Sequence, residues 1–248
     1  MVTAGAPFMT RGQDISGPNF AFLYDPIRDT ILWTIDLNSI TGGKYSGFQD
    51  VDSDPRGNVY VVGTWSSSII RISPEGKDVK IWYLQNPVNQ TRVGFSGIAS
   101  TGNILLVADK NGFNGSRIVR FDATKDIGIP YIVPLTPANF SLEKTDAVYL
   151  PPKYNGRVLL VAVQYNGTAV IVSEDGRWDT AEFKGYIPCA SAADVAGSQM
   201  TANTQIADSL YTVQEWFDWP PNGSLAGNRT TFPMVDITAE VEALVKIK

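Results

Sequence analysis

The sequence contains no histidine and a single cysteine, Cys189, among its 248 residues. Without an imidazole, the chain cannot form a serine–histidine–aspartate or cysteine–histidine nucleophile system, a two-histidine zinc helix or a histidine general base. One cysteine is too few for an internal disulfide, a structural zinc cluster or an iron–sulfur site. Acid–base chemistry must therefore come from Asp, Glu, Tyr or Lys side chains, or catalysis must rest on positioning and electrostatics alone.

The sequence also lacks the run of roughly 18 apolar residues that a membrane helix needs, so no membrane span is expected. It has 20 basic and 25 acidic residues, a formal net charge of −5 and no basic stripe, so nucleic acid is not an expected partner. No glycine-rich phosphate loop precedes a helix, and we expect no nucleotide or other cofactor. With 44% hydrophobic residues the composition is that of a globular protein, which we expect to be a monomer.

Two features bear on localisation and point in different directions. The first eight residues lack the basic start and apolar run of a signal peptide. Against this, the chain has more Asn-x-Ser/Thr glycosylation acceptors than the roughly two expected by chance. The acceptors are Asn89, Asn114, Asn139, Asn166, Asn222 and Asn228. We therefore expect a secreted or secretory-pathway glycoprotein, while a chance excess in a turn-rich protein stays open.

Strand-forming segments dominate the chain, and one plan of four strands repeats three times. Short β-branched and aromatic runs alternate with Gly, Asp, Asn and Pro turns. The inner strands begin near residues 47, 94 and 145, a period of roughly 48 residues that is typical of a propeller blade. The strands that follow are expected at 58–64, 68–72 and 79–83, at 104–109, 117–122 and 131–133, and at 158–163, 168–172 and 181–183.

Partial units flank these three. Residues 201–206 and 210–214 predict two strands of a further unit that finishes at 232–237, while 20–24 and 30–37 predict the outer half of another. Only residues 238–248 show helical spacing. We predict an all-β protein, a β-propeller with about four to five blades of four strands, forming one domain over residues 1–248. Because the chain starts on outer strands, we expect it to lie within a larger protein.

Several separate motifs resemble one family. They are Gly12-Gln13-Asp14, Gly47-Phe48-Gln49-Asp50, Gly57-Asn58-Val59-Tyr60, Glu215-Trp216-Phe217 and the run 226–238. Together they are similar to the fungal propeller proteins of the trichothecene-cluster protein fourteen family, within the lactonase-like superfamily. The resemblance covers nearly the whole chain but only the later two thirds of that family. It therefore implies a six-bladed propeller and a missing N-terminal third that contains the leader and roughly two blades.

The resemblance implies a role in fungal sesquiterpenoid metabolism, with virulence or a non-oxidative ring closure as the associated activity. The leading hypothesis is a small-molecule-binding propeller that acts on a terpenoid, as a cofactor-free cyclase or isomerase. The alternative is a secreted, non-catalytic virulence or ligand-binding protein. Whether the chain is an enzyme at all stays open.

Propellers gather the starts of their inner strands and the adjoining loops around a central channel, where ligands bind. Polar residues at these equivalent points are the candidate substrate-binding groups: Gln49, Ser96, Asp109, Gln164 and Thr204. Trp216 and Trp219 are candidates for an apolar lid, whose ring faces stabilise a cation. For each of these positions an ordinary role in a turn, a cap or the core is the competing interpretation.

Three carboxyl groups are candidate catalytic acids: Asp50, Asp146 and Glu215. A carboxyl in a partly apolar channel favours its neutral form, which protonates a departing hydroxyl or an epoxide before an internal hydroxyl closes the ring. A weaker alternative is an oxygen-rich calcium site formed by Asp50, Asp109, Asp146 and Asn203, as in lactonase-type propellers.

Overall fold

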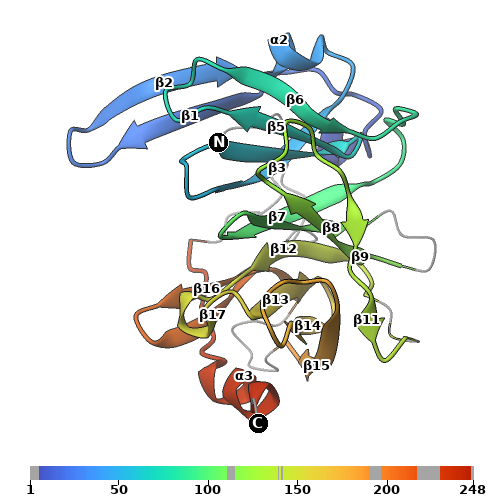
Figure 1. The fold of residues 1–248 in the computed structure, drawn as a ribbon, viewed down its shortest axis with the longest axis vertical. Coiled ribbons are helices and arrows are strands. Elements are labelled where there is room, and N and C mark those ends of the chain that lie inside the picture. The colour runs from blue at the N-terminus through green and yellow to red at the C-terminus, as the bar shows by residue number, and fades with distance from the viewer. Residues whose placement is uncertain are drawn as a thin grey trace. The chain divides into compact units, whose positions relative to one another are not determined.

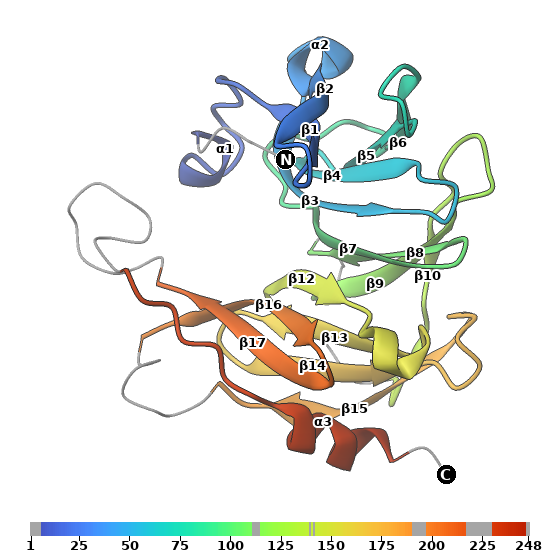
Figure 2. The ribbon, with the colours of Figure 1, turned by 90° about the vertical axis from the view of Figure 1, so that its left-hand side faces the viewer.

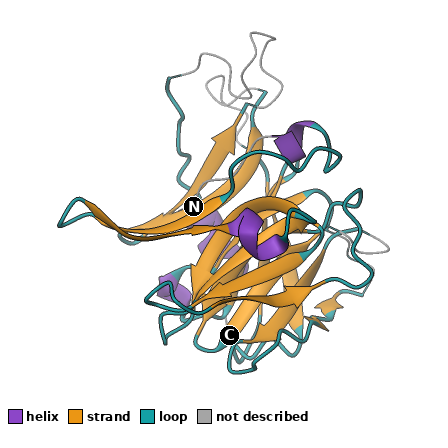
Figure 3. Cartoon of the chain, turned by 90° about the horizontal axis from the view of Figure 1, so that it is seen from above, coloured by secondary structure: helices purple, strands orange, loops and turns teal. Residues whose placement is uncertain are grey.

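The computed structural model describes residues 6–110, 115–138, 140, 142–189, 197–216 and 230–246. Strands make up most of the regular structure and the helices are short (Figure 3). The chain divides into two compact units. Unit 1 comprises residues 1–113 and 117–132, and unit 2 comprises residues 114–116 and 133–248.

Unit 1 contains two four-stranded antiparallel sheets and one two-stranded ribbon (Figure 1). The ribbon pairs β1 (Phe20–Asp25) with β2 (Thr30–Asp36). The first sheet has the order β3 (Ser46–Ser53), β4 (Val59–Trp65), β5 (Ser68–Ile72), β6 (Val79–Leu84). The second runs through β7 (Phe95–Thr101), β8 (Ile104–Asp109), β9 (Arg117–Asp122) and β10 (Tyr131–Ile132).

These two sheets are meanders of consecutive strands, which is the blade plan that the repeat predicts. They pack face to face around a core of aromatic side chains. Trp82 contacts Tyr60 edge to face at 5.1 Å between ring centroids, and Tyr83 stacks on Phe95 at 5.4 Å. The opposite face of the first sheet packs against the β1–β2 ribbon through Phe48 and other buried apolar residues.

Unit 2 contains a five-stranded sheet, a hairpin and a helix (Figure 2). The sheet has the order β11 (Leu135–Thr136), β15 (Ala181–Ile187), β14 (Gly167–Val172), β13 (Val158–Val163), β12 (Thr145–Tyr149), with β11 parallel to β15. The hairpin pairs β16 (Gln199–Ile206) with β17 (Ser209–Glu215). Helix α3 (Thr238–Val245) buries Val241 and Val245 against β14 and β15.

The structure corrects two expectations about secondary structure. Helical turns are not confined to the C-terminal stretch, because α1 (Ala6–Met9), α2 (Leu37–Thr41) and the 3₁₀ turn η1 (Pro152–Tyr154) are also present. The segment 232–237 is not a regular third strand: it makes only an isolated bridge, Asp236 to Tyr211. Helix α2 starts where Asp36 accepts a hydrogen bond from the Asn38 N–H at 2.9 Å, which ends strand β2 one residue earlier than expected.

The turn between β3 and β4 holds the two blades of unit 1 together at one end. The fully buried carboxylate of Asp54 accepts hydrogen bonds from the backbone N–H groups of Arg56 and Asn58 and from the Tyr60 hydroxyl. The Arg56 guanidinium binds the same carboxylate and donates to the Ala123 carbonyl on the second blade. Burial raises the pKa of Asp54, but hydrogen bonds from Asn58 and Arg56 outweigh it and hold the pKa below its ordinary value of 3.8.

Candidate functional site

The starts of the inner strands in unit 1 bring polar side chains of both blades together. From β3, the half-buried Gln49 amide donates to the Thr64 hydroxyl at 2.7 Å and to the Phe95 carbonyl at 3.1 Å. Thr64 donates to the same carbonyl at 2.7 Å. Ser96 follows Phe95 on β7 and is 2% exposed. Two of the expected binding residues, Gln49 and Ser96, therefore lie at one polar seam between the blades.

Asp50 bridges the inner strands of the two blades. One carboxylate oxygen accepts from the Val51 N–H at 2.8 Å and the other from the Ile98 N–H on β7 at 2.9 Å. Two residues further along β3, Asp52 accepts from the Ser100 N–H at 2.6 Å. The side chains of Asp50 and Asp52 thus accept hydrogen bonds from backbone N–H groups along the edge of β7, which would otherwise be exposed and unpaired.

Asp109 ends strand β8 as a buried carboxylate paired with a cation. Its oxygen lies 2.8 Å from the Arg117 guanidinium, and the Asp109 side chain is 4% exposed. Burial raises the pKa of the neighbouring Tyr83 hydroxyl, and the Asp109 charge raises it further. Asp109 is therefore held in an ion pair with Arg117, and its negative charge lies close enough to Tyr83 to affect that hydroxyl.

In unit 2, two groups of buried amides and hydroxyls lie on β16 and its neighbouring strands. Thr168 on β14 donates to the Asn203 side-chain oxygen at 2.6 Å, and both residues are buried. On β17, the buried Gln214 amide accepts from Ser198 at 2.5 Å and donates to Thr212 at 3.1 Å. The Asn203 amide nitrogen has no hydrogen-bond partner within the described part of the chain.

The other candidates of unit 2 lie on the same strands or directly after them. Asp146 is half-buried on β12, and Thr204 is half-buried on β16. Gln164 follows β13, where its carbonyl accepts from the Met200 N–H at 2.9 Å. Glu215 ends β17 and accepts from the Trp216 N–H at 2.9 Å.

Trp216 lies in the core, since it is 0% exposed and its ring lies 6.0 Å from that of Phe232. Trp219 lies outside the described residues, as do the acceptors Asn114, Asn139, Asn222 and Asn228. Of the four residues of the calcium alternative, Asp50 and Asp109 belong to unit 1, and Asp146 and Asn203 belong to unit 2. Over the described residues, no three His, Cys, Asp or Glu side chains form a group that could hold a metal ion.

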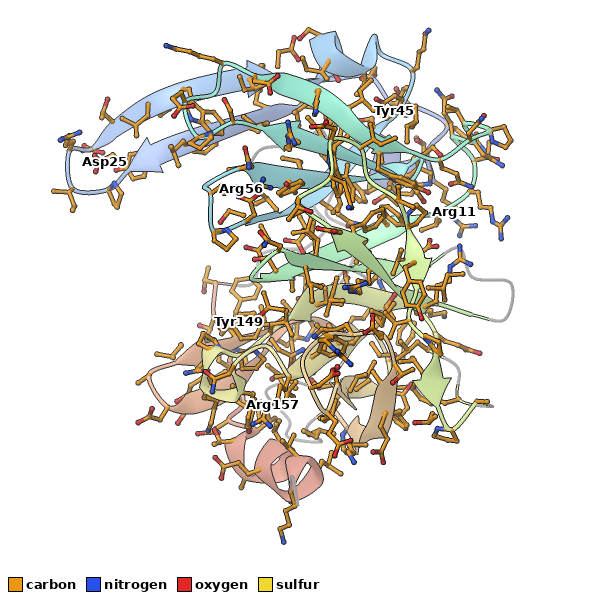
Figure 4. The ribbon with its side chains drawn as sticks, in the orientation of Figure 1. Arg11, Asp25, Tyr45, Arg56, Tyr149 and Arg157 are labelled. Atoms are coloured by element: carbon orange, nitrogen blue, oxygen red, sulfur yellow. The ribbon has the colours of Figure 1, made fainter. Side chains whose placement is uncertain are left out.

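Sequence reasoning missed a cluster of buried polar groups in unit 1, around Trp65. Five side-chain atoms there are buried without a hydrogen-bond partner among the described residues: Tyr45 Oη, Ser46 Oγ, Trp65 Nε1, Ser67 Oγ and Ser68 Oγ. Tyr45, labelled in Figure 4, directly precedes β3 and lies at the opposite end of the blade from Arg56. The run Trp65-Ser66-Ser67-Ser68 has the composition of an ordinary polar turn, so nothing in the sequence alone signals its burial.

No helix in the described ranges is long and apolar enough to cross a membrane. The blades define the class: this is an all-β protein with a propeller-like fold. Solved structures support that class, among them the major allergen Mala s 1 of Malassezia sympodialis, with a TM-score of 0.65 and 24% identity over 85% of this chain and 64% of that one. Virginiamycin B lyase from Staphylococcus aureus gives a TM-score of 0.51 and 18% identity, over 85% of this chain and 60% of that one.

The chain belongs to the Mal s 1 allergenic protein-like family, which residues 31–190 match. It is 33% identical to trichothecene biosynthesis protein 14 of Trichoderma arundinaceum, over 99% of this chain and 67% of the relative. It is 29% identical to core trichothecene cluster protein 14 of Fusarium sporotrichioides, over 99% of this chain and 64% of the relative. The resemblance expected from the motifs is confirmed, and the chain spans about two thirds of the length of these relatives.

Proposed function

We propose that the chain binds a small sesquiterpenoid in fungal secondary metabolism of the trichothecene type. One observation carries the proposal: two relatives named for trichothecene biosynthesis or its gene cluster match 99% of this chain. The polar seam of unit 1 supports it through its neutral acceptor oxygens, because the N–H groups of Gln49 and the O–H of Thr64 already donate within the seam.

Catalysis of ring closure is the finer part of this proposal. Asp50 is a poor candidate for the acid, because both of its oxygens accept backbone N–H groups and so support the structure. Asp146 and Glu215 then remain as the acids that protonate a leaving hydroxyl. Folding the substrate into a near-attack shape supplies the rest of the rate.

Single substitutions to the amide separate catalysis from binding. We expect Asp146→Asn or Glu215→Gln to slow conversion of a sesquiterpenoid substrate on the order of 10²-fold, as for the loss of a general acid. Asp50→Asn serves as the matched control. It should lower the unfolding midpoint, while the turnover rate changes little. Unchanged turnover in both the Asp146 and Glu215 variants, with ligand binding retained in calorimetry, would end the acid-catalysis hypothesis and leave a binding protein.

The alternative is a secreted, non-catalytic ligand-binding or virulence protein, and one observation favours it. Both glycosylation acceptors that the structure describes, Asn89 and Asn166, are exposed. In the first of them, the Asn89 side-chain oxygen accepts from the Thr91 N–H at 3.0 Å and from its hydroxyl at 2.9 Å. The acceptor is therefore held in an accessible turn.

Glycosylation at Asn89 is testable in the native protein. We expect a mass loss on enzymatic deglycosylation, localised by peptide mass spectrometry to Asn89. Thr91→Ala should abolish the modification at this site, whereas Thr91→Ser retains the acceptor and should keep it. Native protein recovered only from the cytosol, with no mass change on deglycosylation, would rule out the secreted form.

A further inference from the structure

A groove of about 560 Å³ lies within unit 2, on one face of the five-stranded sheet. Strand register places Thr136, Glu182 and Val172 in one row across β11, β15 and β14. Residues paired in this way project from the same face of a sheet. Helix α3 packs on that face, because its Val245 belongs to the same buried apolar cluster as Val172 (Figure 2). The groove is therefore built on three adjacent strands beside the end of α3.

The groove has an apolar floor and a polar rim. Val172 and Val245 form the floor and are 7% and 4% exposed. The rim includes exposed residues from two places: Glu174 and Thr180 in the connection between β14 and β15, and Lys246 directly after α3. Binding sites for small molecules have volumes of roughly 300–1,000 Å³ and combine apolar walls with a few polar groups. The volume and the lining of this groove both match that description.

Four charged side chains line the groove, and two of them have no partner. Lys184 and Glu182 form an ion pair with 2.5 Å between the ammonium nitrogen and a carboxylate oxygen, so their charges offset each other. The side chains of Glu174 and Lys246 form no hydrogen bond or ion pair with any residue that the structure describes. The groove thus presents one available anion and one available cation around an apolar floor. Its four charges sum to zero, which favours an occupant whose own charges also balance.

We propose that this groove binds a short apolar peptide with free termini. The ammonium group of the peptide pairs with Glu174, its carboxylate pairs with Lys246, and its apolar side chains cover Val172 and Val245. Such a peptide is zwitterionic near neutral pH, because an α-amino group has a pKa of roughly 7.7–8.0 and an α-carboxyl group one of roughly 3.3–3.7. The proposal goes beyond the sesquiterpenoid function and does not depend on it, since Gln49 and Thr64 belong to unit 1.

The first test varies the ligand and uses the whole chain. Calorimetry compares leucyl-leucine with N-acetyl-leucyl-leucine, which lacks the ammonium group, and with leucyl-leucinamide, which lacks the carboxylate. We expect leucyl-leucine to bind and each blocked peptide to bind about 2- to 5-fold more weakly, as for the loss of one solvent-exposed ion pair. No binding of leucyl-leucine overturns the proposal, and so does equal affinity for all three peptides.

The second test varies the groove. Glu174→Gln should weaken leucyl-leucine by the same factor but leave N-acetyl-leucyl-leucine unaffected, because that peptide has no ammonium group to lose a partner. Lys246→Met should weaken leucyl-leucine and leave leucyl-leucinamide unaffected. Both residues are exposed, so both variants are expected to fold.

Two control variants carry the same changes of charge outside the groove. Asp175→Asn matches Glu174→Gln from the adjacent position, and Lys77→Met matches Lys246→Met from unit 1. Neither control should change the affinity for any of the three peptides. Control losses as large as those of the groove variants would show a general effect of charge. That result overturns the proposal, as does unchanged affinity for leucyl-leucine in either groove variant.

Discussion

Replacing Asp54 with alanine is expected to lower the free energy of unfolding by about 3–5 kcal/mol. The carboxylate is 0% exposed. It accepts hydrogen bonds from two backbone N–H groups, from the Asn58 side-chain amide and from the Tyr60 hydroxyl, and it pairs with Arg56 at 2.9 Å. Removing it leaves buried donors without acceptors and frees the guanidinium that reaches Ala123 on the second blade. Equilibrium unfolding in urea, followed by tryptophan fluorescence and circular dichroism, measures the loss.

The contribution of Asp54 to the free energy of unfolding should also depend on pH, and it should fall in acid. Its pKa is lower in the folded protein than the ordinary 3.8, because hydrogen bonds from Asn58 and Arg56 outweigh its burial. A carboxyl of this kind stabilises the fold fully above its ordinary pKa and ceases to do so as the pH falls through the lowered folded value. The difference in stability between wild type and Asp54→Asn should therefore be constant near neutrality and shrink below pH 3.8.

Asp175 provides the matched control for Asp54. It also accepts from an N–H and a guanidinium two residues ahead, those of Arg177, at 2.9 Å and 2.6 Å. Here, however, the carboxylate is 49% exposed and the guanidinium 72% exposed. Because solvent screens such pairs, Asp175→Ala should lower the free energy of unfolding far less than Asp54→Ala does. Equal losses for the two alanine variants would contradict the structural role assigned to Asp54.

The blade strands could be predicted from sequence because their cause is local. The run 158–163 is apolar throughout and rich in β-branched valine, and β13 occupies those residues with every one buried. A turn follows at once, so both ends of the strand are marked in the sequence. By contrast, the two residues of β11 join the edge of β15 some 46 residues ahead. Nothing in so short a segment indicates which distant strand it will meet.

The candidate site was predictable in part. The position of Gln49 at the start of an inner strand indicated polar surroundings, and its amide contacts Thr64 of its own blade and the Phe95 carbonyl of the next blade. The role of Asp50 was not accessible, because it depends on the register of β3 against the edge of β7. The Trp65 cluster was missed for a similar reason. Its burial depends on Phe8 and Gly12, which lie more than 50 residues earlier in the chain.

Gly167 is the second position where a single substitution should have a large effect. The residue has a φ of 105° at the start of β14, a conformation that side chains with a Cβ avoid. A Cβ atom there would lie 2.0 Å from the Ile187 carbonyl oxygen and 2.8 Å from the Cys189 nitrogen. These are backbone atoms at the end of the neighbouring strand, β15, so they can give way only if the pairing of Thr168 with Ile187 is broken. Backbone strain and overpacking together should cost about 3–5 kcal/mol in Gly167→Ala.

Gly176, in the same unit, separates the cost of backbone strain from the cost of the collision with β15. Its φ is 71°, also positive, but the nearest atom to an added Cβ is the Arg157 Cγ at 3.4 Å, an ordinary contact. Gly176→Ala therefore meets the conformational cost alone, about 1–2 kcal/mol. The excess loss in Gly167→Ala, measured by urea unfolding of both variants, reports the collision with β15. Equal losses would mean that the end of β15 moves away from the added Cβ at no cost. The pairing at the start of β14 would then not depend on the close approach of the Ile187 carbonyl.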